Sequence, residues 1–255
     1  SGIVSVTGEE GGTPVAAGVP LSDLNAGTLA ALGILSACIE RTRSGRGQIV
    51  ETSLFEAALA YTVWESALYF DLGAVAKPNG SKHRLASPSG TFATADGWSA
   101  VGAGTQPCWE RLCDALGRAD LRADERYAHP LSRLEHRHAL EGELAPLFAA
   151  ETTAAWMARL EPAGVPCGPV LGLDEVWRDP QTLARTMVAE DPDAAGRPLK
   201  VIGPPVKLSR TPWEARPQAP GLGEHSAAVL REAGFAEAEV QTLVAAGVIA
   251  GERDE

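Results

Sequence analysis

The chain has 255 residues, enough for one large domain or two modest ones. It carries 22 lysine and arginine residues against 33 acidic ones, which gives a net charge of -11. A protein that binds nucleic acid through its backbone needs a basic face, so this balance argues against that class. An anionic small ligand is not excluded, because a local basic pocket can exist on an acidic protein.

The cysteines and the apolar segments indicate where in the cell the protein is expected to be. The four cysteines form no CxxC pair, so we expect all four to be reduced, with Cys38 a buried thiol on an apolar helix. No apolar run approaches the length of a membrane span, and residues 1–6 lack the features of a signal peptide. The sequence therefore predicts a cytoplasmic protein that does not enter a membrane.

The first 75 residues predict two helices around a short strand, which is part of an α/β unit. Asp23 fits the N-cap of the first helix, and Gly45 fits its left-handed C-terminal residue. The expected elements are an irregular start at 1–17, a helix from Leu24 to about Arg43, a strand at 48–53 and a helix over 54–72.

The rest of the chain predicts a smaller α+β domain followed by a linker and a helical pair. A loop at 73–90 precedes a hairpin whose turn contains Asp96-Gly97. Further expected elements are strands at 90–94, 98–102, 167–171 and 200–202, helices at 106–117, 132–150, 152–163 and 173–185, a proline-rich surface segment at 186–222, and two helices within 223–249. The helix over 132–150 is expected to start with a capping box of Ser132 and Glu135.

The sequence gives little support for a metal site or for a catalytic serine or cysteine. His129, His136 and His138 cluster, but positions i and i+2 of a helix point to different sides, and no HExxH or paired-cysteine spacing exists. There is no GxSxG elbow. The sequence predicts no metal site.

Two loops could meet an anion. Residues 102–106 follow a strand and open a helix, but they lack the remaining signatures of a dinucleotide or P-loop site, so a tight turn is the favoured interpretation. The loop at 79–84 gathers Lys82, His83 and Arg84, which could bind a carboxylate or phosphate or could be a solvated linker.

Asp23 has two compatible interpretations. Capping alone is the default for an aspartate before a helix. A carboxylate held at a helix N-terminus stays ionised, and it can attack an activated acyl group where water is excluded.

Several motifs occur in one order along the chain. They are GVPLSD at 18–23, SGRGQ at 44–48, TADGW at 94–98, AGVPCGPV at 163–170, DPQ at 179–181, LSRTP at 208–212 and APGLGEH at 219–225. Together they resemble the family III CoA-transferases, the group of formyl-CoA and carnitine CoA-transferases with the related α-methylacyl-CoA racemases. The resemblance covers nearly the whole chain.

The resemblance implies that Asp23 is catalytic. In the transferases this carboxylate attacks an acyl-CoA thioester, giving an aspartyl-acyl anhydride and then an aspartyl-CoA thioester that an acceptor acid resolves. Acyl-CoA and a carboxylic acid would be substrates, with no cofactor bound permanently. Lys82 and His83 stand where the family has a glycine-rich loop, and we expect them to hold substrate.

The sequence departs from the family in two ways. Members normally begin with a nucleotide-binding half, whereas this sequence starts just before Asp23. It is therefore expected to be a fragment, a truncated homologue, or a subunit that needs a partner chain. The racemase branch places a glutamate near the position of Thr105, and its absence favours transfer.

The predicted fold is α/β, the C-terminal part of a family III CoA-transferase fold, with a partial Rossmann-like large domain and a smaller α+β domain. Expected segments are 1–78 with the catalytic aspartate, the small domain at 79–185, and a linker and C-terminal segment at 186–255. The family implies an interlocked dimer. The predicted function is CoA transfer; the alternatives are an α-methylacyl-CoA racemase and a non-catalytic half that needs a partner chain.

Overall fold

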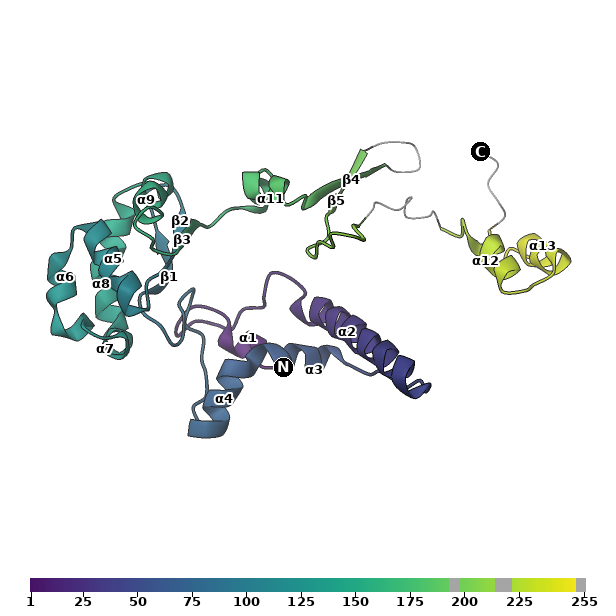
Figure 1. Cartoon of the computed structure of the whole chain (residues 1–255), viewed down its shortest axis with the longest axis horizontal. Coiled ribbons are helices and arrows are strands. Elements are labelled where there is room, and N and C mark those ends of the chain that lie inside the picture. Colours follow the sequence, from purple (N-terminus) through teal and green to yellow (C-terminus); the bar gives the residue numbers. More distant parts are fainter. Residues whose placement is uncertain (193–197, 214–221, 251–255) are drawn as a thin grey trace. The chain divides into compact units, whose positions relative to one another are not determined.

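The computed structural model describes residues 1–192, 198–213 and 222–250 (Figure 1). The chain forms two compact units, Ser1–Val170 and Leu171–Glu255. The domain boundaries expected after residues 78 and 185 remain a prediction. Parts of the expected linker at 193–197 and 214–221, and the chain end at 251–255, lie outside the described residues.

The first unit begins with helices, drawn in purple and blue in Figure 1. They are α1 (Ile3–Val6), α2 (Leu21–Ser44), α3 (Leu54–Leu59), the 3-10 turn η1 (Ala60–Thr62) and α4 (Val63–Leu72). Helix α1 is a single turn within the segment expected to be irregular. Helix α2 confirms the long predicted helix, and it ends as expected at Gly45, whose φ is 71° and whose N–H donates to the Arg41 carbonyl at 2.9 Å.

The strand predicted at 48–53 is wrong, because these residues form no strand. A strand needs a neighbour for its N–H and C=O groups, and the described residues offer this segment none. The segment instead runs beside α2, where a Cβ on Gly33 would come within 2.8 Å of a Val50 methyl group. Ser53 then caps α3 by accepting from the Glu56 N–H at 3.1 Å.

The helix predicted over 54–72 is broken at η1. The Thr62 hydroxyl donates to the Leu59 carbonyl at 2.8 Å, and a threonine that bonds to its own backbone competes with the helical pattern. The apolar residues on either side nevertheless remain helical, so the prediction was right about helix content and wrong about continuity.

Helix α2 exposes its apolar side chains, and none of its residues is buried. More than half of each side chain is exposed at Leu24, Leu32, Ile34, Leu35 and Ile39. Cys38, predicted to be a buried thiol, is also exposed, because α3 and the segment at 48–53 lie beside α2 without burying this residue. Over 18 residues, α2 has a hydropathy of 1.3, so by length and composition it could cross a membrane, which corrects the expectation that no run approaches that length. The core helix of a soluble protein passes the same test.

A three-stranded antiparallel sheet lies at the centre of residues 89–169. Strands β1 (Ser89–Ala93) and β2 (Trp98–Gly102) confirm the predicted hairpin, and the Thr94 N–H donates to the Gly97 carbonyl at 2.9 Å across the turn. Strand β3 (Cys167–Pro169) pairs with the other edge of β2, so β2 is central. Val101 stands opposite Cys167 in this pairing.

Helices pack against this sheet and against one another around a common core. They are α5 (Gln106–Leu116), α6 (Ala119–Ala123), the 3-10 turn η2 (Glu125–Tyr127), α7 (Pro130–Glu135), α8 (Arg137–Ala149) and α9 (Thr153–Leu160). The predicted helix over 132–150 is therefore two helices. It also starts earlier than expected, because Pro130 suits the first helical position and His129 is the N-cap, which corrects the capping box placed at Ser132.

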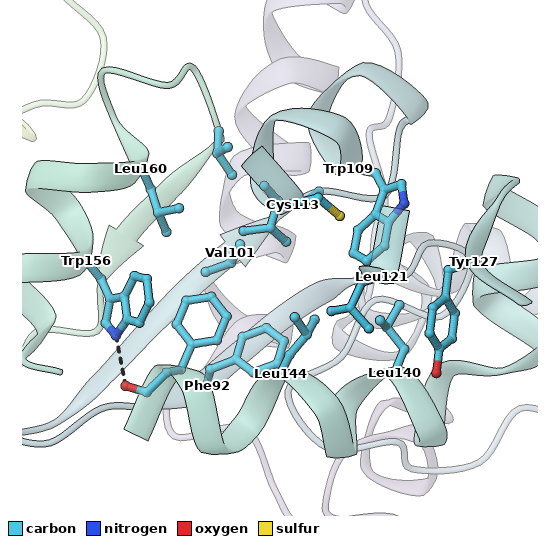
Figure 2. Packing of buried hydrophobic residues seen from close by; sticks show 14 residues of the cluster. Phe92, Val101, Trp109, Cys113, Leu121, Tyr127, Leu140, Leu144, Trp156 and Leu160 are labelled. Carbon is cyan, nitrogen blue, oxygen red and sulfur yellow. Dashed lines mark hydrogen bonds between the residues drawn. The ribbon is translucent and has the colours of Figure 1, made fainter. Parts of the chain in front are cut away.

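The buried core of this region is shown in Figure 2. The Phe92 and Phe148 rings stack with centroids 4.6 Å apart, and Phe148 lies 4.8 Å from the Trp156 ring. The Trp156 indole N–H donates to the Phe148 carbonyl at 2.8 Å, so its one polar group is satisfied. Each fully buried large side chain contributes about 1.5–3 kcal/mol to folding.

The second unit contains short helices and a two-stranded antiparallel sheet. Its elements are α10 (Leu173–Val176), α11 (Pro180–Ala184), β4 (Val188–Pro192), β5 (Pro198–Ile202), α12 (Ser226–Glu232) and α13 (Glu237–Ala245). The predicted helix over 173–185 is broken, because Asp179 caps a new helix by accepting from the Gln181 N–H at 2.9 Å. Strand β5 and the pair α12 and α13 confirm their predictions.

Candidate functional site

Asp23 is the third residue of α2, so it lies in the first turn and not at the N-cap, where Pro20 stands. Its side chain accepts a hydrogen bond from the Ser22 hydroxyl at 3.0 Å and is exposed. The expected cap is therefore corrected. A first-turn carboxylate still lies near the positive end of the helix dipole, which is a favourable position for a negative charge.

The start of α2 is held in place by α3. The Asn25 side-chain N–H donates to the Ala57 carbonyl at 2.7 Å, and Ala57 is fully buried. Among the described residues, no acceptor is found for the backbone N–H groups of Ser22 and Asp23. The first turn thus combines a fixed backbone, an exposed carboxylate and two backbone donors that are free to bind an anion.

The loop that carries Lys82 and His83 is bound to β1. The His83 N–H donates to the Ser89 carbonyl at 2.8 Å, and Lys82 bridges to Gly90. The Lys82 ammonium forms an ion pair with Glu141 of α8. Strand pairing and an ion pair therefore order these two residues, and whether they bind an anion remains a prediction.

The His83 ring is fixed in one tautomer. Its Nδ1 accepts the Leu85 N–H at 3.1 Å, so in the neutral ring the proton is on Nε2. The ring also lies 5.4 Å from the Trp64 ring, centroid to centroid, at a tilt of 54°. These contacts make His83 a hydrogen-bond donor of defined orientation.

Lys82 and His83 both line an open pocket of about 510 Å³ over the sheet. The other lining residues are Ser81, Ser89, Gly90, Thr91, Ala100, Val101, Gly102, Pro166 and Cys167. A Cβ on Gly90 would come within 2.7 Å of the Ser81 carbonyl, so only glycine allows the loop to approach the strand this closely. Asp23 is not a lining residue, so the structure brings Lys82 and His83 together and does not bring Asp23 to them.

Two pocket features escaped the sequence interpretation. Cys167 reaches the pocket through the β2–β3 pairing, and Glu141 reaches Lys82 from a helix 59 positions further along the chain. For Cys167, the sequence signal was the predicted strand at 167–171. For Glu141, the sequence contained no signal. Burial raises the pKa of the Cys167 thiol, so it is protonated at neutral pH and is a weak nucleophile.

The strand-to-helix turn at 102–106 is the tight turn that the sequence favoured. A Cβ on Gly104 would come within 2.7 Å of Ala86, and the guanidinium of Arg133 donates to the Gly104 carbonyl at 3.1 Å. Arg133 is fully buried, and it also donates to the carbonyls of Ser87 and Tyr127 at 3.1 and 3.0 Å. Burial lowers the pKa of Arg133, and its carbonyl partners compensate for the loss of water. This arginine therefore ties the turn at Gly104 to the chain at Ser87 and Tyr127.

The sequence of the chain matches the model of CoA-transferase family III over residues 1–226. The chain belongs to CoA-transferase family III. An acyl-CoA transferase of Fusarium pseudograminearum is 38% identical over 237 residues, which are 92% of this chain and 52% of that protein. The succinyl-CoA:glutarate CoA-transferase of Mus musculus is 31% identical over 250 residues, 98% of this chain and 57% of that protein.

A solved structure gives the same family. A CAIB/BAIF family protein from Brucella suis, 31% identical, aligns with a TM-score of 0.75 over 91% of this chain and 60% of that protein. The predicted fold class, α/β and the C-terminal part of a family III CoA-transferase fold, is confirmed. This family III chain spans about half to three-fifths of the length of the relatives it matches.

Proposed function

We propose that this chain transfers coenzyme A between carboxylic acids and that Asp23 is the nucleophile. The observation that carries the proposal is an exposed carboxylate in the first turn of α2, in a chain that belongs to CoA-transferase family III. Coenzyme A enters and leaves as a substrate, and no cofactor is bound permanently. All four cysteines are free, which fits a cytoplasmic location.

The reaction divides into acyl exchanges. An Asp23 carboxylate oxygen attacks the thioester carbonyl, the C–S bond breaks, and an aspartyl-acyl anhydride and CoA thiolate result. The thiolate then attacks the aspartyl carbonyl, giving an aspartyl-CoA thioester and the free donor acid. The acceptor carboxylate attacks this thioester, and the returning thiolate takes the acceptor acyl group and restores Asp23. Each step exchanges one acyl bond for another, so no external proton or oxidant is needed.

The first turn of α2 suits the charge that develops in these steps. Each tetrahedral intermediate carries a negative oxygen, which backbone N–H donors stabilise best when they are already fixed in place. The N–H groups of Ser22 and Asp23 have no acceptor in the described part of the chain, and the contact between Asn25 and Ala57 holds this turn. They are the donors that we assign to the oxyanion.

Lys82 and His83 are proposed to hold the acid substrate. Lys82 supplies a cation, and the proton on His83 Nε2 supplies an oriented donor beside the same pocket. The Mus musculus relative is named for succinyl-CoA and glutarate, both derived from dicarboxylic acids. We therefore propose a dicarboxylic acceptor, one carboxylate of which lies against Lys82 and His83.

Completion of the site is proposed to need a second polypeptide surface. The exposed leucine and isoleucine side chains of α2 are unusual for a helix that positions a nucleophile, since large exposed apolar patches mark contact surfaces. We propose that a second copy of the chain in an interlocked dimer, or a separate chain with a nucleotide-binding half, covers this face and brings CoA to Asp23.

A transfer assay tests the proposal. The chain is incubated with succinyl-CoA and glutarate, alone and with a separately expressed nucleotide-binding chain, and glutaryl-CoA is measured by mass spectrometry. Asp23→Asn should lower the transfer rate at least about 10³-fold, whereas Asp71→Asn, an exposed aspartate of α4, should leave it unchanged. Undiminished transfer by Asp23→Asn would contradict the proposal. Solvent-deuterium exchange at the α-carbon of a 2-methylacyl-CoA without transfer would indicate a racemase instead.

A further inference from the structure

A second pocket in the first unit carries several cations. It has a volume of about 370 Å³ and is separate from the pocket of Lys82 and His83. Its lining residues are Glu10, Gly11, Leu68, Ala74, Val75, Ala76, Lys77, Pro78, Asn79, Arg84 and Arg137. Three of them are cationic and one is acidic, so the pocket has an excess of positive charge on a protein that is acidic overall.

The two arginines of this pocket are well shielded but loosely paired. Only 19% of the Arg84 side chain and 22% of the Arg137 side chain are exposed. Arg84 lies 3.3 Å from a Glu65 oxygen, and Arg137 lies 3.4 Å from a Glu10 oxygen. Charge-assisted hydrogen bonds are usually about 2.7–2.9 Å long, so neither carboxylate satisfies its arginine well.

The third cation, Lys77, has no side-chain partner among the residues that the structure describes. The Lys77 ammonium pairs with no group in the described parts of the chain, although the Lys77 carbonyl accepts from the Arg84 guanidinium at 2.9 Å. This bond holds the Arg84 side chain against the loop that carries Lys77. Three cations, from a loop and from the start of α8, thus line one pocket, and two of them have only long contacts with carboxylates.

Glu10 reaches the pocket on a segment that is bound to the loop. The Gly80 N–H donates to the Gly8 carbonyl at 2.8 Å, and Gly80 has a φ of +64°, where a side chain would be strained. Glu10 also lies 3.7 Å from His138. The Glu10 carboxylate thus lies beside Arg137 and His138 at long distances. An anion that forms shorter hydrogen bonds with these cations could take its place.

We infer that this pocket binds a phosphate group. Arginine forks match the oxygen atoms of a phosphate with two parallel N–H bonds, and lysine adds a point charge. A phosphate carries more negative charge than Glu10 and displaces it from Arg137. The inference concerns binding alone and does not depend on the chemistry of Asp23.

Titration calorimetry of the whole chain with inorganic phosphate tests the inference. Arg137→Gln and Lys77→Gln should each weaken binding about tenfold, which corresponds to about 1.4 kcal/mol. Glu10→Gln should strengthen it about threefold, because it removes the competing carboxylate. The matched control is Arg159→Gln. It removes an arginine of α9 that pairs with Glu151, and it should leave phosphate binding unchanged. Asp23→Asn should also leave binding unchanged, so a failure here is distinct from a failure of the proposed transferase reaction.

Two further ligands identify the source of the phosphate. If the 3′-phosphate of CoA is the ligand, CoA should bind about tenfold more tightly than dephospho-CoA, and Arg137→Gln should abolish the difference. If free phosphate or another phosphate ester is the ligand, the two should bind equally while inorganic phosphate still binds. The absence of saturable phosphate binding in the wild type and in Glu10→Gln would overturn the inference. An equal loss in Arg159→Gln would overturn it too, because the effect would then be one of net charge.

Discussion

Apolar side chains are buried in the core around the sheet and exposed on helix α2. Around the sheet, Leu144 and Phe148 are fully buried, whereas on α2 the side chains of Leu24 and Leu35 are both 62% exposed. The core residues around the sheet bury one another, whereas none of the residues of α2 is buried. The difference teaches that this family III chain combines a packed scaffold around the sheet with a helix, α2, whose apolar side chains the described residues leave exposed.

The largest expected effect is the difference in unfolding free energy between truncating a core leucine and truncating an exposed one. Leu144→Ala should lower the free energy of unfolding by about 2–5 kcal/mol, because it leaves a cavity in a packed core. Leu35→Ala should change it by no more than about 0.5 kcal/mol. Urea titration of both variants measures this. A large cost for Leu35→Ala in a self-associated sample would show that a second copy covers α2, and it would vanish on dilution.

Arg133 tests how the core supports the pocket. Arg133→Met keeps an apolar stem but leaves the carbonyls of Ser87, Gly104 and Tyr127 without their donor. Buried polar groups without partners cost about 1–3 kcal/mol each, so for three carbonyls we expect the free energy of unfolding to fall by at least about 3 kcal/mol. Urea titration measures the loss. Unchanged stability would show that water replaces the guanidinium and that the turn does not depend on it.

Glu141 tests the charge of the pocket itself. Glu141→Gln releases the Lys82 ammonium from its partner, and the pair is only partly exposed. Binding of glutarate should strengthen about two- to fivefold, the range expected for one such pair. Calorimetry with glutarate measures it, and Glu143→Gln is the control, because that acid pairs with Arg118 away from the pocket. Weaker binding in Glu141→Gln would mean that the ion pair positions Lys82 and does not compete for it.

The smallest expected effect is a pH dependence in the hairpin turn. Asp96 accepts from the Thr153 N–H at 2.8 Å, and this hydrogen bond is the main reason why its pKa is lowered from 3.8. Because the folded pKa is below the unfolded one, the contribution is present above pH 3.8 and is lost as the pH falls through the folded value. The protection factors of residues 94–97 against hydrogen exchange, which correct for the intrinsic pH dependence of exchange, should therefore fall in acid. Asp96→Asn should remove the pH dependence in that range, and a wild-type profile in this variant would contradict the assignment.

The sequence predicted local features well and distant pairings poorly. The Asp96-Gly97 pair correctly predicted the hairpin turn, and Gly45 correctly predicted the end of α2. Both predictions succeeded because these signals depend only on adjacent residues. The strand at 48–53 and the burial of Cys38 were wrong, because each needs a neighbour that local periodicity assumes but cannot supply.

The candidate site divides in the same way. The position of Asp23 near a helix start was visible in the sequence, although the cap is Pro20. The ion pair of Lys82 with Glu141 and the approach of Cys167 to the pocket follow from packing and strand pairing over long sequence distances. The sequence also gave no sign that Arg133 is buried, since an arginine on a short helix is ordinarily exposed.

The most direct measurement is to trap the covalent intermediate. The chain is incubated with succinyl-CoA, quenched with hydroxylamine and digested with trypsin, which releases residues 1–41 as one peptide, since the first basic residue is Arg41. The account predicts a hydroxamate on Asp23 alone, and not on Glu9, Glu10 or Glu40 of the same peptide. A hydroxamate on another acidic residue, or transfer with no trappable adduct, would contradict the assignment of Asp23 as the nucleophile.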